Sequence, residues 1–203
     1  MAHVHEVTIW ARGVVQDKEG RDVSQIIALG AERENKFTQA FDDYEDLPDR
    51  VGVPVRKYSR ISDEEIVMRY DYENENPEVV IVMEEAIVKG IYILRHMTTK
   101  GILVVNTKRP AADILKFIPN KDLLDKIVCV DAEDIAKGVA TVDFSGSEGG
   151  IDATTLGAGI SAPLVGAAMK ASGLVAFENV EAVVMNKEAL KRGFEEAVIE
   201  PAN

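Results

Sequence analysis

The sequence predicts an α/β fold that is Rossmann-like, with a mainly parallel sheet, helices on both faces and an edge hairpin. The first observation is a set of short β-branched runs that are apolar throughout, at residues 7–10, 79–83, 102–105 and 127–130. Continuous apolar character is typical of strands that are covered on both faces. The second observation is that helix-like stretches alternate with these runs, as they do in doubly wound sheets.

Helices are expected between and after these runs. The expected ranges are 23–31, 86–97, 111–117, 132–137, 163–172, 177–181 and 187–197. Asn179 and Asn186 are alternative N-caps near the C-terminus, because an Asn side chain accepts hydrogen bonds from the free N–H groups of a first helical turn. The small residues around Gly166 predict a helix that packs closely against a neighbour.

Two segments break this alternation within what we expect to be a single domain over residues 1–203. Residues 42–76 are polar and acidic, but 53–61 and 66–70 show partial alternation, which predicts a hairpin with one solvated face at the edge of the sheet. Residues 145–159 form a glycine-rich loop, a composition typical of a flexible segment or of a close approach by another backbone or ligand.

The turn after the first strand lacks the glycines of a phosphate-binding loop. Gly13 and Gly20 are separated by bulky and acidic residues, so no G-x-G-x-x-G motif can be drawn. Such a loop brings backbone N–H groups close to a phosphate at a helix N-terminus. Asp17 and Glu19 at that position would repel a phosphate. The chain therefore has the architecture of a binding domain without the loop chemistry, which favours a supporting subunit.

Composition excludes several classes of function. The formal net charge of −12 argues against nucleic acid and anionic membranes as partners. The one cysteine, Cys129, lies in an apolar run and is expected to be a buried core residue, so the chain itself offers no cysteine-built cluster or zinc site. No signal segment and no run of 18 apolar residues is present, which predicts a cytoplasmic protein.

No catalytic constellation and no metal site is predicted. Glu84 and Glu85 follow a strand at its carboxyl end, where open α/β sheets place their sites, but acidic residues at a helix start are the simpler interpretation. His3 and His5 lack a third ligand at a diagnostic spacing, and His96 stands alone.

Two polar clusters remain as candidates for binding. Arg50, Arg56, Lys57 and Arg60 either contact an anionic group on a partner or neutralise nearby Asp and Glu residues, and the sequence does not choose between these. The polar run that begins at Asn106 and Thr107 directly follows the strand at 102–105, so it either lines a crevice or starts a loop.

The order of several short motifs resembles the gamma subunit of the 2-oxoacid:ferredoxin oxidoreductases, most closely the pyruvate type. The motifs are residues 6–13 (EVTIWARG), 36–41 (KFTQAF), 50–55 (RVGVPV) with 59–61 (SRI), 76–82 (NPEVVIV), 101–107 (GILVVNT), 130–132 (VDA) with 135–136 (IA), and 164–167 (LVGA) with 170–175 (KASGLV). Each is weak alone, but seven in the right order are fairly specific.

The resemblance implies a role inside a larger complex. Family members decarboxylate a 2-oxoacid on thiamine diphosphate and pass electrons through iron–sulfur clusters to ferredoxin, usually leaving the acyl group on coenzyme A. It implies that this chain binds no cofactor alone, that thiamine diphosphate and the 4Fe-4S clusters lie on partner chains, and that the partners are alpha and beta subunits, with a delta subunit left open. The crevice on the matching side is expected to comprise Arg12, Gly13, Arg50, Gly52, Pro54, Asn106 and Thr107.

The chain departs from the family at the turn after the first strand, where 14–20 replaces a glycine-rich turn, and residues 145–159 look like an insertion. These departures favour a member in which this subunit does not bind coenzyme A, for example one from an oxalate-type enzyme, which needs no acyl acceptor. The alternative function is a stand-alone module that binds a small metabolite or nucleotide through residues 12–20 and 145–159.

Overall fold

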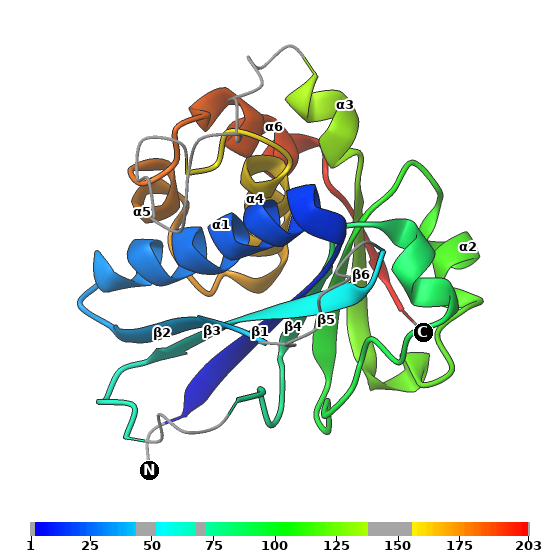
Figure 1. The fold of residues 1–203 in the computed structure, drawn as a ribbon, viewed down its shortest axis with the longest axis horizontal. Helices are drawn as coiled ribbons and strands as arrows, with labels where there is room; N and C mark the ends of the chain where they lie inside the picture. The colour runs from blue at the N-terminus through cyan, green and yellow to red at the C-terminus, as the bar shows by residue number, and fades with distance from the viewer. Residues whose placement is uncertain (1–2, 44–51, 68–71, 138–155, 203) are drawn as a thin grey trace.

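A single seven-stranded sheet organises the computed structural model, which describes residues 3–43, 52–67, 72–137 and 156–202. Its strand order is β2-β3-β1-β4-β5-β6-β7, as Figure 1 shows. The strands are β1 (Val4–Arg12), β2 (Phe37–Asp42), β3 (Pro54–Ser62), β4 (Val79–Val82), β5 (Gly101–Asn106), β6 (Leu124–Val130) and β7 (Val198–Pro201). The four central strands, β1, β4, β5 and β6, are parallel, and this confirms the predicted fold class.

The four predicted strands form this parallel centre. All four residues of β4 are buried, and Leu103, Val104 and Val128 in the neighbouring strands have no exposed surface. Successive side chains of a strand point to opposite faces, and here alternate residues belong to two separate cores: Val79 and Ile81 to one, Val80 and Val82 to the other. The continuous apolar runs therefore arise because both faces are covered.

The margins of the sheet are antiparallel, and the predicted hairpin between 53–61 and 66–70 is wrong. Strand β3 already has a neighbour on each side, since it pairs with β1 and with β2. Residues 66 and 67 lie in no strand, and 68–70 fall outside the described residues. The edge hairpin is instead formed by β2 and β3, and at the opposite edge β7 pairs antiparallel with β6. The local alternation in the sequence could not reveal that β3 pairs with the N-terminal strand.

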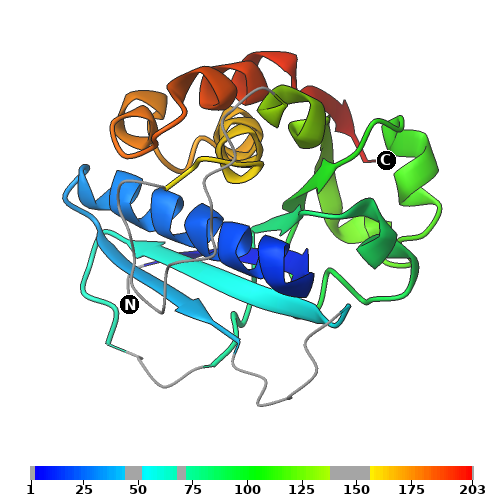
Figure 2. The ribbon, with the colours of Figure 1, turned by 45° about the horizontal axis from the view of Figure 1, so that its top comes forward.

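Helices cover the two faces of the sheet unequally. The α-helices are α1 (Gly13–Glu32), α2 (Ala111–Leu115), α3 (Ala132–Ala136), α4 (Ser161–Ser172), α5 (Phe177–Glu181) and α6 (Lys187–Glu196), and the 3-10 helices are η1 (Glu85–Lys89) and η2 (Lys121–Leu123). Helices α1 and α4 pack on one face, and α5 and α6 form an outer layer above them (Figures 1 and 2). The other core is closed by η1, α2 and the turns between them. Among the described residues no helix is both long enough and apolar enough to cross a bilayer.

Two predicted helices differ from the structure. Helix α1 begins at Gly13, ten residues before the predicted start, so residues 13–20 form its first turns rather than a loop. Gly20 lies inside this helix, on the side that faces the sheet. A Cβ at this position would come within 3.3 Å of Ala11 and Lys57, so the lack of a side chain lets α1 lie close to the sheet. Residues 86–97 form only η1 and turns. The β-branched residues of this segment, together with Gly90, disfavour a longer helix.

The C-terminal helices confirm the expected close packing. An added Cβ at Gly166 of α4 would lie 2.2 Å from the carbonyl oxygen of Leu190 in α6, and one at Gly193 would lie 2.2 Å from that of Pro163. Two reciprocal glycines therefore let the helix backbones approach closely. The Asn186 side chain accepts a hydrogen bond from Ala189 N–H and caps α6, whereas Asn179 lies inside α5 and is not its N-cap.

Candidate functional site at the carboxyl ends of the parallel strands

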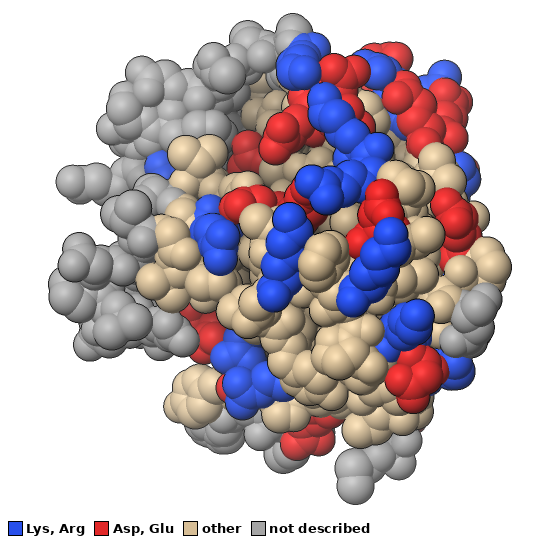
Figure 3. Space-filling view, turned by 90° about the vertical axis from the view of Figure 1, so that its right-hand side faces the viewer, with Lys and Arg blue, Asp and Glu red and all other residues tan. Residues whose placement is uncertain are grey.

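A crevice of about 310 Å³ opens where the parallel strands β4, β5 and β6 end. In open α/β sheets this is the edge at which ligands bind. We call it the strand-end crevice; its lining residues are Glu84, Glu85, Asn106, Thr107, Lys108, Arg109, Asp131 and Glu133. Figure 3 views the right-hand side of Figure 1, where Lys and Arg side chains lie across the middle of the face among Asp and Glu side chains.

The cations of the strand-end crevice are paired with its own carboxylates. Arg109 Nε lies 3.1 Å from Glu85 Oε1, and Lys108 Nζ lies 3.2 Å from Asp131 Oδ2. Arg12, at the end of β1, reaches Glu84 at 3.7 Å. Half-exposed pairs of this kind contribute little stability and exchange partners readily. The crevice is therefore a mixed-charge surface with a net acidic balance, not a preformed anion site.

Asn106 and Thr107 connect the strand ends to one another. The Asn106 amide donates to the carbonyl of Met83 at 2.9 Å, and its oxygen accepts from Ala132 N–H at 3.0 Å. Thr107 Oγ1 donates to Glu85 and accepts from Arg109 N–H. The buried Asn106 thus joins the ends of β4 and β5 to the start of α3, while Thr107 orients the crevice's carboxylate. Both residues line the strand-end crevice, and their role in binding stays a prediction.

Helix α1 follows β1 without any intervening loop, in agreement with the missing phosphate motif. Gly13 has φ +74°, a conformation that favours glycine, and allows the chain to turn from strand to helix in one residue. The Gln16 side chain accepts from Arg12 N–H at 3.0 Å and satisfies one of the free donors at the helix start. Gly13 is the one glycine of this first turn, and Val14, Val15 and Gln16 follow it, so the turn is not glycine-rich.

The sequence suggested that Asp17 and Glu19 lie at the N-terminus of the first helix, and this is wrong. Both lie beyond the first turn of α1, where each has a partner. Asp17 pairs at 2.7 Å with Lys57, whose side chain is 2% exposed and also lies 3.3 Å from Asp42. Glu19 accepts a hydrogen bond from Ile160 N–H at 3.0 Å. Asp17 thus neutralises a buried lysine, and Glu19 fixes the segment that leads into α4.

The buried Glu19 and the half-buried Asp22 form an acidic pair that sequence reasoning missed. Burial raises the pKa of Glu19 to about 7 and that of Asp22 to about 6, and the hydrogen bonds from Ile160 and Gly157 offset only part of this effect. A Cβ at Gly159 would lie 2.1 Å from the Glu19 carboxylate, so a larger residue there would displace this side chain from its present position. Of the predicted glycine-rich loop, residues 145–155 lie outside the described residues, and 156–159 pack against this pair.

The predicted site residues fall into two groups. Arg12, Gly13 and Pro54 lie together, because Arg12 and Pro54 are partners in the β1–β3 register, and Gly52 precedes Pro54 with φ +80°. Asn106 and Thr107 line the strand-end crevice. The ion pair between Arg12 and Glu84 connects the two groups, whereas Arg50 lies outside the described residues. Any function of these residues in cofactor binding stays a prediction.

The remaining members of the basic cluster support the neutralisation interpretation. Arg56 donates to Asp43 at 2.6 and 2.9 Å and to Glu73 at 3.0 and 3.2 Å, and its guanidinium lies 5.4 Å from the centre of the Trp10 ring. Arg60 donates to Asn74 and to the carbonyl of Glu73. His96, with φ +65°, also contacts Glu73. These cations hold Asp43, Glu73 and Asn74 against β1 and β3.

The strand-end crevice holds one side-chain hydroxyl, that of Thr107, which donates to Glu85. None of the eight residues that line it is His, Cys or Ser. Cys129 is buried in β6, and burial raises the pKa of its thiol to about 11, so the prediction of a core cysteine is confirmed. The geometry defines a class of protein: an α/β domain with a charged crevice at its strand ends.

Comparison with known proteins gives the family. Residues 22–200 match the model of the pyruvate ferredoxin/flavodoxin oxidoreductase family. The chain is similar to the pyruvate synthase subunit PorC of Thermotoga maritima, with 31% identity over 87% of each chain. It is also similar to the common gamma subunit of the pyruvate/ketoisovalerate oxidoreductases of Thermococcus kodakarensis, with 29% identity over 86% of this chain and 80% of that one. The chain belongs to the pyruvate ferredoxin/flavodoxin oxidoreductase family, among its gamma subunits.

A solved structure supports the same conclusion. The fold matches the crystal structure of the pyruvate oxidoreductase subunit PORC from Thermotoga maritima with a TM-score of 0.72 and 27% identity, over 97% of this chain and 98% of that one. The resemblance found in the order of short motifs is therefore confirmed, as is the α/β fold that it implied.

Proposed function

We propose that this chain is a supporting gamma component of a multi-subunit 2-oxoacid:ferredoxin oxidoreductase, and that it contributes no catalytic group of its own. The observation that carries this proposal is the match to gamma subunits over nearly the whole chain. The strand-end crevice agrees with it, because its charged groups are arranged in pairs rather than as an acid, a base and a nucleophile.

In this proposal the redox chemistry belongs to partner chains. A 4Fe-4S cluster needs four thiolate ligands, and this chain has one cysteine, which is buried. We therefore propose that the 4Fe-4S clusters lie on partner chains. The family resemblance further implies that thiamine diphosphate also lies there, that the partners are alpha and beta subunits, with a delta subunit as a further candidate, and that ferredoxin is the electron acceptor of the complex. Residues 1–203 would act as one domain, because every described strand joins one sheet. We propose that this domain works in the cytoplasm.

The strand-end crevice is proposed as a surface that meets a partner subunit. Its ion pairs are half-exposed, so a basic or acidic side chain from another chain can replace one member at little cost. Exposed apolar side chains add to the surface available for partners, with Val198 and Ile199 on the edge strand β7 exposed by 54% and 36%. An unpaired strand edge of this kind is itself a site for association.

We further propose that this subunit does not bind coenzyme A. The start of α1 lacks glycine-built phosphate contacts, and Arg12, Lys108 and Arg109 are all paired with carboxylates. An oxalate-type complex, which needs no acyl acceptor, would have this property, and so would a complex that binds the acceptor on another chain. The identity of the 2-oxoacid, pyruvate-like or oxalate, depends on a pocket that the proposal places on those chains.

Two measurements test this proposal. Isothermal titration with coenzyme A should give no heat of binding for the isolated chain, and tight binding that is lost in Arg12→Ala would contradict it. Mass measurement of the chain captured from its native source should show a hetero-oligomer. A monodisperse monomer that gains thermal stability with a small metabolite would favour the stand-alone module. That alternative is weakened already, because 13–20 is helical rather than a binding loop.

A further inference from the structure

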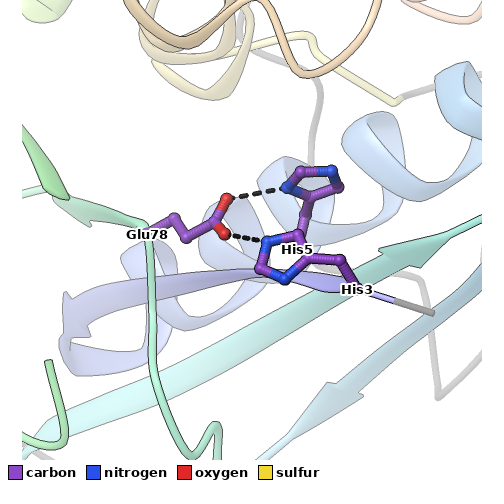
Figure 4. A group of neighbouring side chains, drawn as sticks. All are labelled: His3, His5 and Glu78. Carbon is purple, nitrogen blue, oxygen red and sulfur yellow. Dashed lines mark hydrogen bonds and ion pairs between the residues drawn. The ribbon is translucent and has the colours of Figure 1, made fainter. Parts of the chain in front are cut away.

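Three potential metal ligands converge at the amino end of the sheet, opposite the strand-end crevice. His5 lies in β1, His3 directly precedes that strand, and Glu78 directly precedes β4 (Figure 4). His5 Nδ1 lies 2.7 Å from Glu78 Oε2, and His3 Nε2 contacts Oε1 of the same carboxylate. One ligand atom from each residue can be chosen so that all lie within 4.8 Å of one another.

The sheet places these donors together. His3 and His5 alternate along the chain, so both side chains leave the same face. β1 and β4 are parallel neighbours, which brings Glu78 alongside across 73 residues of sequence. The third ligand that the sequence lacked at any diagnostic spacing is therefore supplied by strand pairing.

The backbone of Glu78 is fixed before any ion binds. Its N–H donates to the carbonyl of Glu6 at 2.9 Å, and its own carbonyl accepts from Ile102 N–H at 2.8 Å. The residue is thus held between β1 and β5, and only its side chain remains to be ordered. A donor held by its surroundings loses less freedom on binding, which favours affinity.

The charges at this place favour a cation. Within the described part of the chain, only the two imidazoles contact the Glu78 carboxylate, and no Lys or Arg lies within ion-pair distance of it. Neutral imidazoles and one carboxylate give the cluster a charge of about −1, on a chain whose net charge is −12. The side chains of His3, His5 and Glu78 are 63%, 36% and 25% exposed, so an ion can reach them.

We propose that His3 Nε2, His5 Nδ1 and a carboxylate oxygen of Glu78 bind one Zn²⁺ ion. Two nitrogens and one oxygen suit Zn²⁺, whereas Mg²⁺ and Ca²⁺ prefer all-oxygen sites and Cu(I) prefers sulfur. A site with three protein ligands leaves a fourth position for water. The site lies at the end of the sheet away from the strand-end crevice. The ion therefore has a structural role: it links the start of β1 to the start of β4.

The test uses the full chain without a histidine tag, stripped with EDTA and titrated with Zn²⁺ by calorimetry and with Co²⁺ by visible absorption. We expect one equivalent to bind with a Kd of roughly 1 μM or below, the affinity range of a preformed three-ligand site. At Zn²⁺ a hundredfold above Kd, the melting temperature should rise by about 5–10 °C. His3→Gln, His5→Gln and Glu78→Gln should each weaken binding at least tenfold. His96→Gln is the matched control and should bind like the wild type.

Two outcomes would overturn the proposal. One is binding only at millimolar Zn²⁺. The other is wild-type affinity in Glu78→Gln, which would assign the ion to the N-terminal His-X-His segment alone. Circular dichroism and melting in EDTA establish that each variant is folded. His3→Gln changes the most exposed of the three side chains. It therefore reports on the site even if replacing the half-buried His5 or Glu78 disturbs the sheet.

Discussion

The buried acid Glu19 makes the stability of this protein depend on pH in a direction opposite to that of an ion-paired carboxylate. Its side chain lies between α1 and the segment leading into α4, and burial raises its pKa from 4.5 to about 7. Between about pH 4.5 and 7 the folded protein holds a proton that the unfolded chain has lost, so the free energy of unfolding falls as pH rises. The contribution is complete below about pH 4.5 and is lost above about pH 7.

The change to make is Glu19→Gln, which keeps the shape of the side chain and removes its titration. A rise in pKa from 4.5 to about 7 corresponds to roughly 3 kcal/mol. The free energy of unfolding of the variant minus that of the wild type should therefore increase by about that amount between pH 4.5 and pH 8. Urea denaturation followed by circular dichroism, at pH intervals of about one, measures this difference.

The matched control is Glu32→Gln, at the exposed C-terminal end of the same helix. This variant measures the effect of removing one exposed charge from the helix. If Glu19→Gln retained the pH dependence of the wild-type protein, the assignment of a buried, protonated Glu19 would be refuted. The pKa of Asp22, beside Glu19, is also raised, from 3.8 to about 6, so Asp22→Asn should flatten the profile between about pH 3.8 and 6.

Three further predictions concern the packing of the fold. Gly166→Ala should lower the free energy of unfolding by about 3 kcal/mol, because its Cβ would lie 2.2 Å from a carbonyl of α6, whereas Gly90→Ala, where nothing lies within 4 Å, should have a small effect in the same urea assay. Asp17→Asn should destabilise the protein by up to about 3 kcal/mol, since it removes the 2.7 Å partner of the buried Lys57; an unchanged melting temperature would contradict that pairing. Cys129 should react with a disulfide reagent at pH 8 only after unfolding in guanidinium, because burial raises its pKa to about 11; rapid reaction of the native chain would show that the thiol is accessible.

The parallel centre of the fold could be predicted from the sequence, because a strand that is buried on both faces is a continuous apolar run in the sequence. The strands around Ile81, Val104 and Val128 are continuous apolar runs, and the helices at 163–172 and 187–197 carry small residues and an Asn cap. The partner of β3 could not be predicted, since pairing with β1 depends on contacts some fifty residues apart. The early start of α1 was missed because Asp17 and Gly20 suggest a loop. Asp17 is instead the partner of the buried Lys57, and Gly20 lets the helix lie close to the sheet.

The candidate site was predictable only in part, for the same reason. Asn106 and Thr107 could be placed at the crevice because they directly follow a buried strand, and Arg12 because it ends the first one. The pairing of Glu19 with Ile160 joins segments more than a hundred residues apart, and that of Glu78 with His5 joins segments 73 apart. Neither leaves a signal in the spacing of the residues concerned.

We propose that this chain works as one subunit of an iron–sulfur oxidoreductase, and capture of its native complex is the experiment that tests this. The chain is captured from its native source, and the visible absorption of the captured material is recorded before and after adding pyruvate or oxalate, with mass spectrometry of the same sample. We expect larger subunits to co-purify with the chain and to show broad iron–sulfur absorption. This absorption should bleach when the 2-oxoacid that the complex uses, pyruvate or oxalate, is added. A colourless species of 22.2 kDa with no co-purifying chain would contradict it.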